Sequence, residues 1–265
     1  MGGHTYNTPP IKLELISPTI NEYVCELNRI FPIVNFNFIP LGSTGKKAES
    51  GDIDLGISET ILCPIKLNIN PTKLYKRIEK LNNRARTSNE SQLRLKAILI
   101  EMSDVINSSS KLININLKKI TTGTIFSSFP QYNNDSIVQI DWMVGNLNWL
   151  QFAYFSDVYD DHNIKGLHRT QLLVALFNII GLIFVHTLGI KNQSNNIVTT
   201  SPQTALTLVN DSLNLKLNVS MASNFFTLYD HLERNLDTFH FNLLIAEYVK
   251  ILKLTPNCIV PKCVG

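Results

Sequence analysis

The segment Asp52-Ile53-Asp54-Leu55 constrains the fold of this chain more than any other. Its strict alternation predicts a β-strand, with Asp52 and Asp54 on one face and Ile53 and Leu55 on the other. Two carboxylates held side by side on a rigid strand repel each other unless a cation lies between them. Magnesium is the hard divalent ion best suited to such oxygen ligands near phosphates. The segment therefore predicts a sheet strand with one face on a core and the other at a metal site.

A glycine-serine pair precedes this strand. Gly42-Ser43 is followed by a polar loop of eight residues that ends at Asp52. Glycine lets the backbone approach a phosphate closely, and Ser43 offers a hydroxyl and the positive end of a short helix. Lys46 and Lys47 lie in the same loop and would neutralise phosphate charge. The pair predicts a phosphate-binding turn beside the metal site.

The same loop does not form a P-loop. That pattern needs four residues between its two glycines and a Ser or Thr after its lysine. Here only two residues separate Gly42 from Gly45, and Lys47 follows Lys46. NTP hydrolysis of the P-loop type is therefore not expected.

The composition is that of a folded protein. The 265 residues are 44% hydrophobic and 17% charged, which suits one large domain or two modest ones with a real core. A net charge of +3 is compatible with a nucleic-acid partner without demanding one. The first residues lack the basic and then apolar pattern of a secretion signal, so the expected location is the cytoplasm.

Capping and alternation predict further elements along the chain. Helices are expected over 17–31, with Ser17-Pro18 as its start, over 70–86, which is rich in Lys and Arg, and over 91–106. Strands are expected over 36–39, 112–117 and 137–144. After the third strand we expect a long apolar helix, a hairpin over 205–219 and two amphipathic helices. The predicted class is α+β, with a mixed-sheet lobe over 1–156 and a mainly helical lobe over 157–265.

The apolar stretch 172–190 is about as long as a membrane span. It contains Asn178, Gly181, His186 and Thr187, and nothing else in the chain resembles a membrane protein. A helix that is apolar all round also fits the centre of a helical lobe. We expect a buried core helix and no membrane attachment, with the membrane span as the alternative.

Gly42-Ser43, the Asp52-x-Asp54 pair and Asp141 on a later strand resemble the nucleotidyltransferase superfamily. That superfamily includes DNA polymerase beta, poly(A) and CCA-adding polymerases, and antibiotic- and toxin-type nucleotidyltransferases. The resemblance covers the first lobe. Its departures are the slightly short loop before Asp52 and the long interval between Asp54 and Asp141.

The resemblance implies a nucleotidyltransferase-type sheet and a metal-dependent reaction. Asp52 and Asp54 would bind two Mg²⁺ ions, with Mn²⁺ as a substitute, and Asp141 would be the third ligand and the acceptor of a proton. Lys165 and Arg169, at the start of the second lobe, would contact the outer phosphates of the nucleotide.

The implied substrate is an NTP, with ATP expected, whose NMP is transferred with release of pyrophosphate. An RNA 3′ end is the favoured acceptor because of the mild basicity and the basic helix over 70–86. A protein hydroxyl and a small molecule are the alternatives. A non-catalytic nucleotide sensor on the same fold is the alternative from another functional class.

Overall fold

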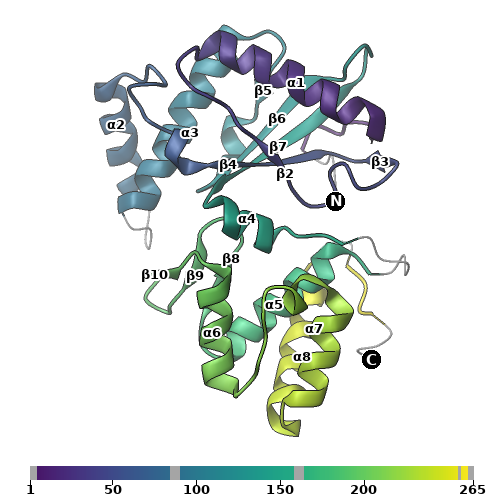
Figure 1. Ribbon diagram of the computed structural model, residues 1–265. Helices are drawn as coiled ribbons and strands as arrows, with labels where there is room; N and C mark the ends of the chain where they lie inside the picture. The colour runs from purple at the N-terminus through teal and green to yellow at the C-terminus, as the bar shows by residue number, and fades with distance from the viewer. Residues whose placement is uncertain (1–4, 84–89, 158–163, 256–257, 262–265) are drawn as a thin grey trace. The chain divides into compact units, whose positions relative to one another are not determined.

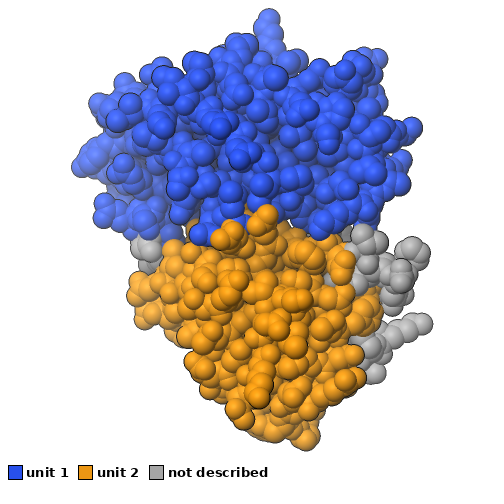
Figure 2. Space-filling model, in the orientation of Figure 1, with its two compact units in different colours: residues 1–147 blue, residues 148–265 orange. Residues whose placement is uncertain are grey.

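The computed structural model describes residues 5–83, 90–157, 164–255 and 258–261. These residues divide into two compact units, 1–147 and 148–265, which are coloured separately in Figure 2. The predicted lobe boundary lies at 156 instead. The difference arises because Trp149 and Phe152 of helix α4 (Leu147–Ala153) pack into the hydrophobic core of the second unit. Helices and strands are mixed in the chain, in agreement with the predicted α+β class.

Unit 1 is built on a five-stranded sheet with the strand order β2-β4-β7-β6-β5 (Figure 1). The strands are β2 (Ile39–Pro40), β4 (Ile53–Ser58), β5 (Asn114–Ile115), β6 (Thr124–Pro130) and β7 (Ile137–Gly145). Strands β4 and β7 are parallel, whereas the other neighbouring pairs are antiparallel. Two further strands, β1 (Ile11–Lys12) and β3 (Glu49–Ser50), form a separate antiparallel pair.

Three helices complete unit 1: α1 (Leu13–Ile30), α2 (Pro71–Asn82) and α3 (Glu90–Ser109). Tyr23 of α1 and Met102 of α3 share a core with Ile53, Leu55 and the other apolar residues of their strand face. Because strand side chains alternate, the residues between them in sequence lie on the opposite face of the sheet. The apolar residues of β4 and β7 therefore face this core, and Asp54 and Asp141 lie on the other face of the sheet.

Three predicted elements of unit 1 have clearly different limits in the structure. The predicted strand over 36–39 is only β2, which begins at Ile39. Helix α1 begins at Leu13, so Pro18 lies inside it and Ser17 is not its cap. The helix tolerates Pro18 near its start, where only one backbone hydrogen bond is lost. The predicted strand over 112–117 is reduced to β5 because a 3-10 turn, Leu117–Lys119, follows. Asn70 caps α2 as predicted, while the expected extension to residues 84–86 lies outside the described residues.

Unit 2 is mainly helical and carries a small antiparallel sheet. Its helices after α4 are α5 (Gly166–Ile179), α6 (Pro202–Leu213), α7 (Phe225–Asn235) and α8 (Thr238–Leu254). The sheet has the order β10-β9-β8, from β8 (Ile183–Val185), β9 (Gly189–Lys191) and β10 (Ile197–Thr199). A 3-10 turn spans Met221–Ser223 in this unit, and another spans Glu59–Ile61 in unit 1.

The predicted apolar helix is buried as expected but shorter than 172–190, and the prediction of a hairpin over 205–219 was wrong. The apolar stretch is a helix that ends at Ile179, followed by β8 and β9. Gly181 has a φ of +77°, and its N–H binds the Asn178 carbonyl, which closes the helix. The predicted hairpin is largely helix α6, whose first turn is capped by the Ser201 hydroxyl and begins with Pro202.

Candidate functional site

Three carboxylates come together on the face of the unit 1 sheet opposite the core of Ile53 and Leu55. Asp54 of β4 lies directly opposite Asp141 of the parallel strand β7. Asp52 precedes β4 and shares the face of Asp54. One carboxylate oxygen from each of Asp52, Asp54 and Asp141 lies within 4.8 Å of the others. The structure therefore joins the three predicted metal ligands from two segments of the chain.

This crowding changes how readily the carboxylates ionise. Burial, and then the charges of Asp52 and Asp141, raise the pKa of Asp54 well above its usual value of 3.8. Burial also raises the pKa of Asp141 to about 7, while a hydrogen bond from Gln139 lowers it and the charge of Asp52 raises it. Negative charges placed so close together favour a cation between them.

Gln139 holds the third carboxylate in place. It stands two residues before Asp141, on the same strand face, and its Nε2 donates at 2.9 Å to both carboxylate oxygens. The backbone N–H of Thr5 donates in turn to Gln139 Oε1 at 3.0 Å. Gln139 is buried, so water does not compete for these bonds. Gln139 is not among the residues predicted from the sequence, although its spacing of two from Asp141 places both on one strand face.

The neighbouring Tyr6 fixes the same N-terminal segment to the sheet. Its hydroxyl lies 2.9 Å from the carbonyl oxygens of both Asn114 and Phe126. Burial raises the pKa of Tyr6 to about 12, the backbone of Asn116 lowers it, and the charge of Asp141 raises it. The tyrosine is therefore a neutral donor at physiological pH.

The predicted phosphate-binding turn lies directly against Asp54. Gly42 adopts a φ of +59°, and a Cβ at this position would lie 2.8 Å from Asp54 Oδ2. Only glycine satisfies both the left-handed backbone and the close approach. The Asp54 N–H donates to Thr44 Oγ1 at 2.8 Å, and the Leu41 N–H donates to the Asp54 carbonyl at 2.9 Å. Ser43, between these anchors, is half-buried.

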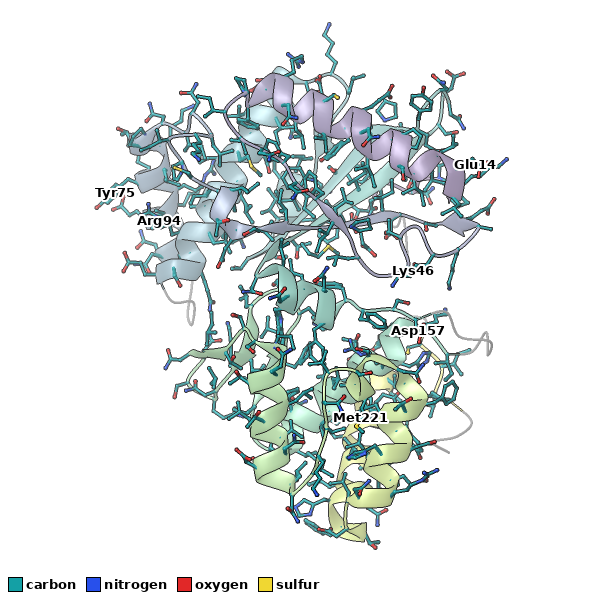
Figure 3. All side chains as sticks on the ribbon, viewed as in Figure 1. Glu14, Lys46, Tyr75, Arg94, Asp157 and Met221 are labelled. Carbon is teal, nitrogen blue, oxygen red and sulfur yellow. The ribbon has the colours of Figure 1, made fainter. Side chains whose placement is uncertain are left out.

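Lys46 and Lys47 lie on the exposed part of the same loop, between β2 and β3. Figure 3 labels Lys46, whose side chain extends from the loop. The N–H of Lys46 donates to the Ser43 carbonyl at 3.0 Å, which tightens the turn. Neither lysine is buried in the core, so an anion in solvent is within reach of both side chains.

Lys165 and Arg169 belong to unit 2, and the structure gives Arg169 a different part from the predicted phosphate contact. Arg169 is fully buried. Its Nε donates to the Ala222 carbonyl at 2.7 Å, and its Nη1 donates to the Phe152 carbonyl. The guanidinium also stacks on the Phe152 ring, 4.7 Å from the ring centre. We therefore assign Arg169 to the internal packing of unit 2.

Lys165 and His168 form the first turn of α5. The Lys165 side chain is exposed, and its backbone N–H donates to His168 Nδ1 at 2.9 Å. His168 is buried, and its Nε2 therefore carries the proton and donates to the Ile259 carbonyl at 2.9 Å. His168 is thus a structural residue that joins the helix start to the C-terminal segment.

The donor set fits a hard divalent cation. Carboxylate oxygens from two adjacent strands are the ligands that Mg²⁺ and Mn²⁺ prefer, and the raised pKa values are those of acids that lack a counter-charge. The backbone of the adjoining turn lies against Asp54 at Gly42. The three carboxylates could hold a metal ion beside this turn.

Comparisons with known proteins give no independent assignment. In the part of the chain that the structure describes, no helix combines the length and the apolar character needed to cross a bilayer. No protein-family model matches the chain, and no curated protein shows significant sequence similarity to it.

Proposed function

We propose that this protein is a metal-dependent nucleotidyltransferase, which transfers an NMP from an NTP to an acceptor hydroxyl and releases pyrophosphate. The observation that carries the proposal is the contact between a positive-φ glycine turn and a cluster of three carboxylates. Gly42 abuts Asp54, whose register partner is Asp141. Phosphate and metal would therefore bind at adjoining positions, as transfer at an α-phosphate requires.

Each residue has a distinct role in this proposal. Asp52, Asp54 and Asp141 would hold two Mg²⁺ ions, with Mn²⁺ as a substitute. When bound, the ions would polarise the α-phosphate and lower the pKa of the acceptor hydroxyl. The Gly42-Ser43 turn would bind the triphosphate through its backbone and hydroxyl. Asp141, with a pKa of about 7 before metal binds, is suited to accept the proton of that hydroxyl.

The favoured substrates are ATP and an RNA 3′ end. A protein hydroxyl or a small molecule is the alternative acceptor. A nucleotide sensor without catalysis is the alternative function, but it gives no reason for a third carboxylate that Gln139 orients through both of its oxygens. Lys46 is the loop cation retained as a phosphate contact, whereas Arg169 is not retained.

The test is transfer of label from the α-phosphate. The full chain is incubated with MgCl₂, each of the four α-labelled NTPs or γ-labelled ATP, and one acceptor at a time. The acceptors are an RNA of about 20 nucleotides, the same RNA with a 3′-deoxy end, mixed cellular protein, and mixed small metabolites. We expect the α-label and not the γ-label to join the normal RNA, and the 3′-deoxy end to abolish transfer.

A test variant and a control variant each remove two negative charges. Asp52→Asn with Asp54→Asn should reduce transfer by at least about a thousandfold, because metal-binding carboxylates are lost. Asp211→Asn with Glu233→Gln, both exposed in unit 2, should leave it unchanged. Magnesium-dependent NTP binding without transfer to any acceptor would instead favour the sensor. Label on protein or metabolites alone would leave the chemistry standing and replace RNA as the acceptor.

A further inference from the structure

A hollow of about 600 Å³ lies on unit 1 between α2, α3 and the segment that leads into α2. We call it the α2–α3 hollow. Helix α2 contributes Lys73, Lys76 and Lys80 to its wall, and Asn68 and Ser108 add polar groups. In Figure 1, α2 lies alongside α3 at one end of unit 1. The carboxylate site uses none of these residues.

Helical spacing aligns the three lysines. Positions 73, 76 and 80 are three and four residues apart, so they share one face of α2. The rise of 1.5 Å per residue spreads them over about 10 Å along the helix axis. All three side chains are exposed. Within the described parts of the chain, no carboxylate forms an ion pair with Lys73, Lys76 or Lys80.

The two carboxylates of the hollow are both paired with one arginine. Arg77 Nε donates to Glu101 at 2.8 Å, and Arg77 Nη2 donates to Asp104 at 3.0 Å. This bridge also ties α2 to α3 and fixes the wall that carries the lysines. One arginine against two carboxylates leaves one negative charge, and the three lysines exceed it by two. The hollow is therefore a fixed site of positive charge.

The type of charge indicates the type of ligand. Lysine ammonium groups are compact, hydrated point charges that bind phosphate without reading its surroundings. No aromatic ring lines the described wall of the hollow for base stacking. Tyr75 of the same helix does not line it, projects away from unit 1 in Figure 3 and is 70% exposed. These features suit a series of phosphates and not individual bases.

We propose that the α2–α3 hollow binds the phosphodiester backbone of a single-stranded nucleic acid, without regard to sequence, through Lys73, Lys76 and Lys80. The proposal rests on the proposed function, because a polymer acceptor needs a binding site besides the one for its reacting end. Over the length spanned by the lysines, a nucleic-acid strand carries more than one phosphate. Acidic polypeptide is the competing ligand that the test must separate.

The experiment measures binding without chemistry. A fluorescent single-stranded 20-residue RNA of mixed sequence is titrated with the full chain in EDTA, without NTP, over a series of KCl concentrations. The variant Lys73→Gln/Lys76→Gln/Lys80→Gln is compared with Lys12→Gln/Lys216→Gln/Lys253→Gln. The control changes three exposed lysines elsewhere, so the net charge falls by the same amount in both variants. Circular dichroism verifies that each variant remains folded.

Because the hollow variant lacks three phosphate-binding lysines, the slope of log K against log salt should fall by about 2, since each lysine-phosphate pair on a single strand adds about 0.7. Affinity at 0.1 M KCl should fall by at least about tenfold, and the control should bind as the wild type does. An unchanged slope in the hollow variant overturns the proposal. An equal decrease in the control overturns it too, because general charge would then explain binding.

Competition separates the ligand classes. A polyglutamate of 20 residues should displace the RNA far less effectively than an unlabelled RNA of equal length, and equal displacement would overturn the nucleic-acid assignment. Failure here is distinguishable from failure of the proposed function. If nucleotidyl transfer is absent, the binding curves in EDTA still test the hollow. If transfer is intact but the salt slopes are unchanged, only the proposal for the hollow is refuted.

Discussion

Asp54 and Asp141 are register partners on the parallel strands β4 and β7, so two carboxylates separated by most of unit 1 in sequence face each other across one strand pair. Backbone hydrogen bonds along both strands fix this pairing. The repulsion between the charges therefore cannot be relieved by moving the strands apart. It is relieved by a proton or by a cation, and this competition sets the first prediction.

The metal-free protein should lose stability as the pH rises from about 4 to about 7. Asp141 has an ordinary pKa of 3.8 and a folded pKa of about 7. Its protonated form is favoured by folding, so its contribution is full below about pH 4 and disappears as the pH passes 7. That contribution is at most about 4 kcal/mol. Asp54 acts in the same direction.

Urea unfolding in EDTA at pH 5 and pH 8 measures this loss. Asp141→Asn should reduce the difference between the two pH values, whereas Asp211→Asn in unit 2 should not. Magnesium at millimolar concentration should stabilise the wild type more at pH 8 than at pH 5, because the ion binds the ionised carboxylates. A pH difference of the same size in Asp141→Asn would contradict the assignment.

Gly42→Ala should damage activity far more than its effect on stability suggests. A methyl group at this position meets Asp54 Oδ2 at 2.8 Å, and the carboxylate must move to admit it. Displacement of a metal ligand by this amount should lower the rate by on the order of a hundredfold. The left-handed backbone adds about 1–2 kcal/mol of strain, seen in urea unfolding.

Gly45→Ala is the matched control. Gly45 has a φ of +75°, but no atom lies within 4 Å of the position of its Cβ. Its substitution should therefore cost a similar amount of stability and leave the rate of nucleotidyl transfer close to that of the wild type. Equal activity in the two variants would show that the contact with Asp54 is irrelevant to function.

Gln139→Leu should shift the pH dependence of transfer upward. The Gln139 amide lowers the pKa of Asp141, so its removal should raise that pKa further. More hydroxide is then needed to ionise the carboxylate, and the acidic limb of the rate profile should move to higher pH. We expect transfer at pH 7 to fall about 10- to 100-fold, as for other groups that orient metal ligands.

The comparison for this position is Gln131→Leu, which changes another buried glutamine of unit 1. It should lower stability without moving the pH profile, because Gln131 has no described contact with the three carboxylates. A rate loss in Gln139→Leu with an unshifted profile would mean that the residue serves packing alone.

Arg169→Ala should destabilise unit 2 by about 3–5 kcal/mol. The change removes a buried, hydrogen-bonded guanidinium and leaves the carbonyls of Ala222 and Phe152 without these donors. Arg169→Lys should also destabilise, since an ammonium cannot reproduce the forked geometry. Lys165→Gln, at an exposed position, should unfold like the wild type. A stable Arg169→Ala protein with weakened NTP binding would restore the phosphate role that the sequence predicted.

Local pattern accounts for the parts of the site that the sequence could predict. Strand geometry alone predicts that Asp52 and Asp54 lie on one face. The conformational freedom of glycine alone predicts a tight turn at Gly42. Asp141 was named from a resemblance, and its position beside Asp54 depends on long-range strand pairing that no local pattern encodes. Gln139 and Thr44 escaped notice because ordinary polar residues acquire their roles only through neighbours fixed by the fold.

The burial of Arg169 was not predicted from the sequence. A basic residue at a helix start suggests an exposed contact, yet carbonyls from two other segments enclose Arg169. In the apolar run 172–190, the helix ends at Ile179, just before Gly181, which has a positive φ. Helix α6 was predictable from the local sequence, because Ser201-Pro202 is the same helix-start pattern as Ser17-Pro18. At Ser201 the pattern marks the true start of a helix, whereas at Ser17 the helix has already begun.

The anchoring of the Gly42 turn has a consequence for how this protein can vary. Leu41 and Thr44 tie the turn to the backbone of Asp54, and β3 resumes the fold at Glu49. The exposed residues that follow Lys46 can thus be lengthened, shortened or exchanged while the three carboxylates and the turn keep their positions. Under the proposed function, a change in this part of the loop would alter the surroundings of the acceptor and leave the carboxylates and the turn in place.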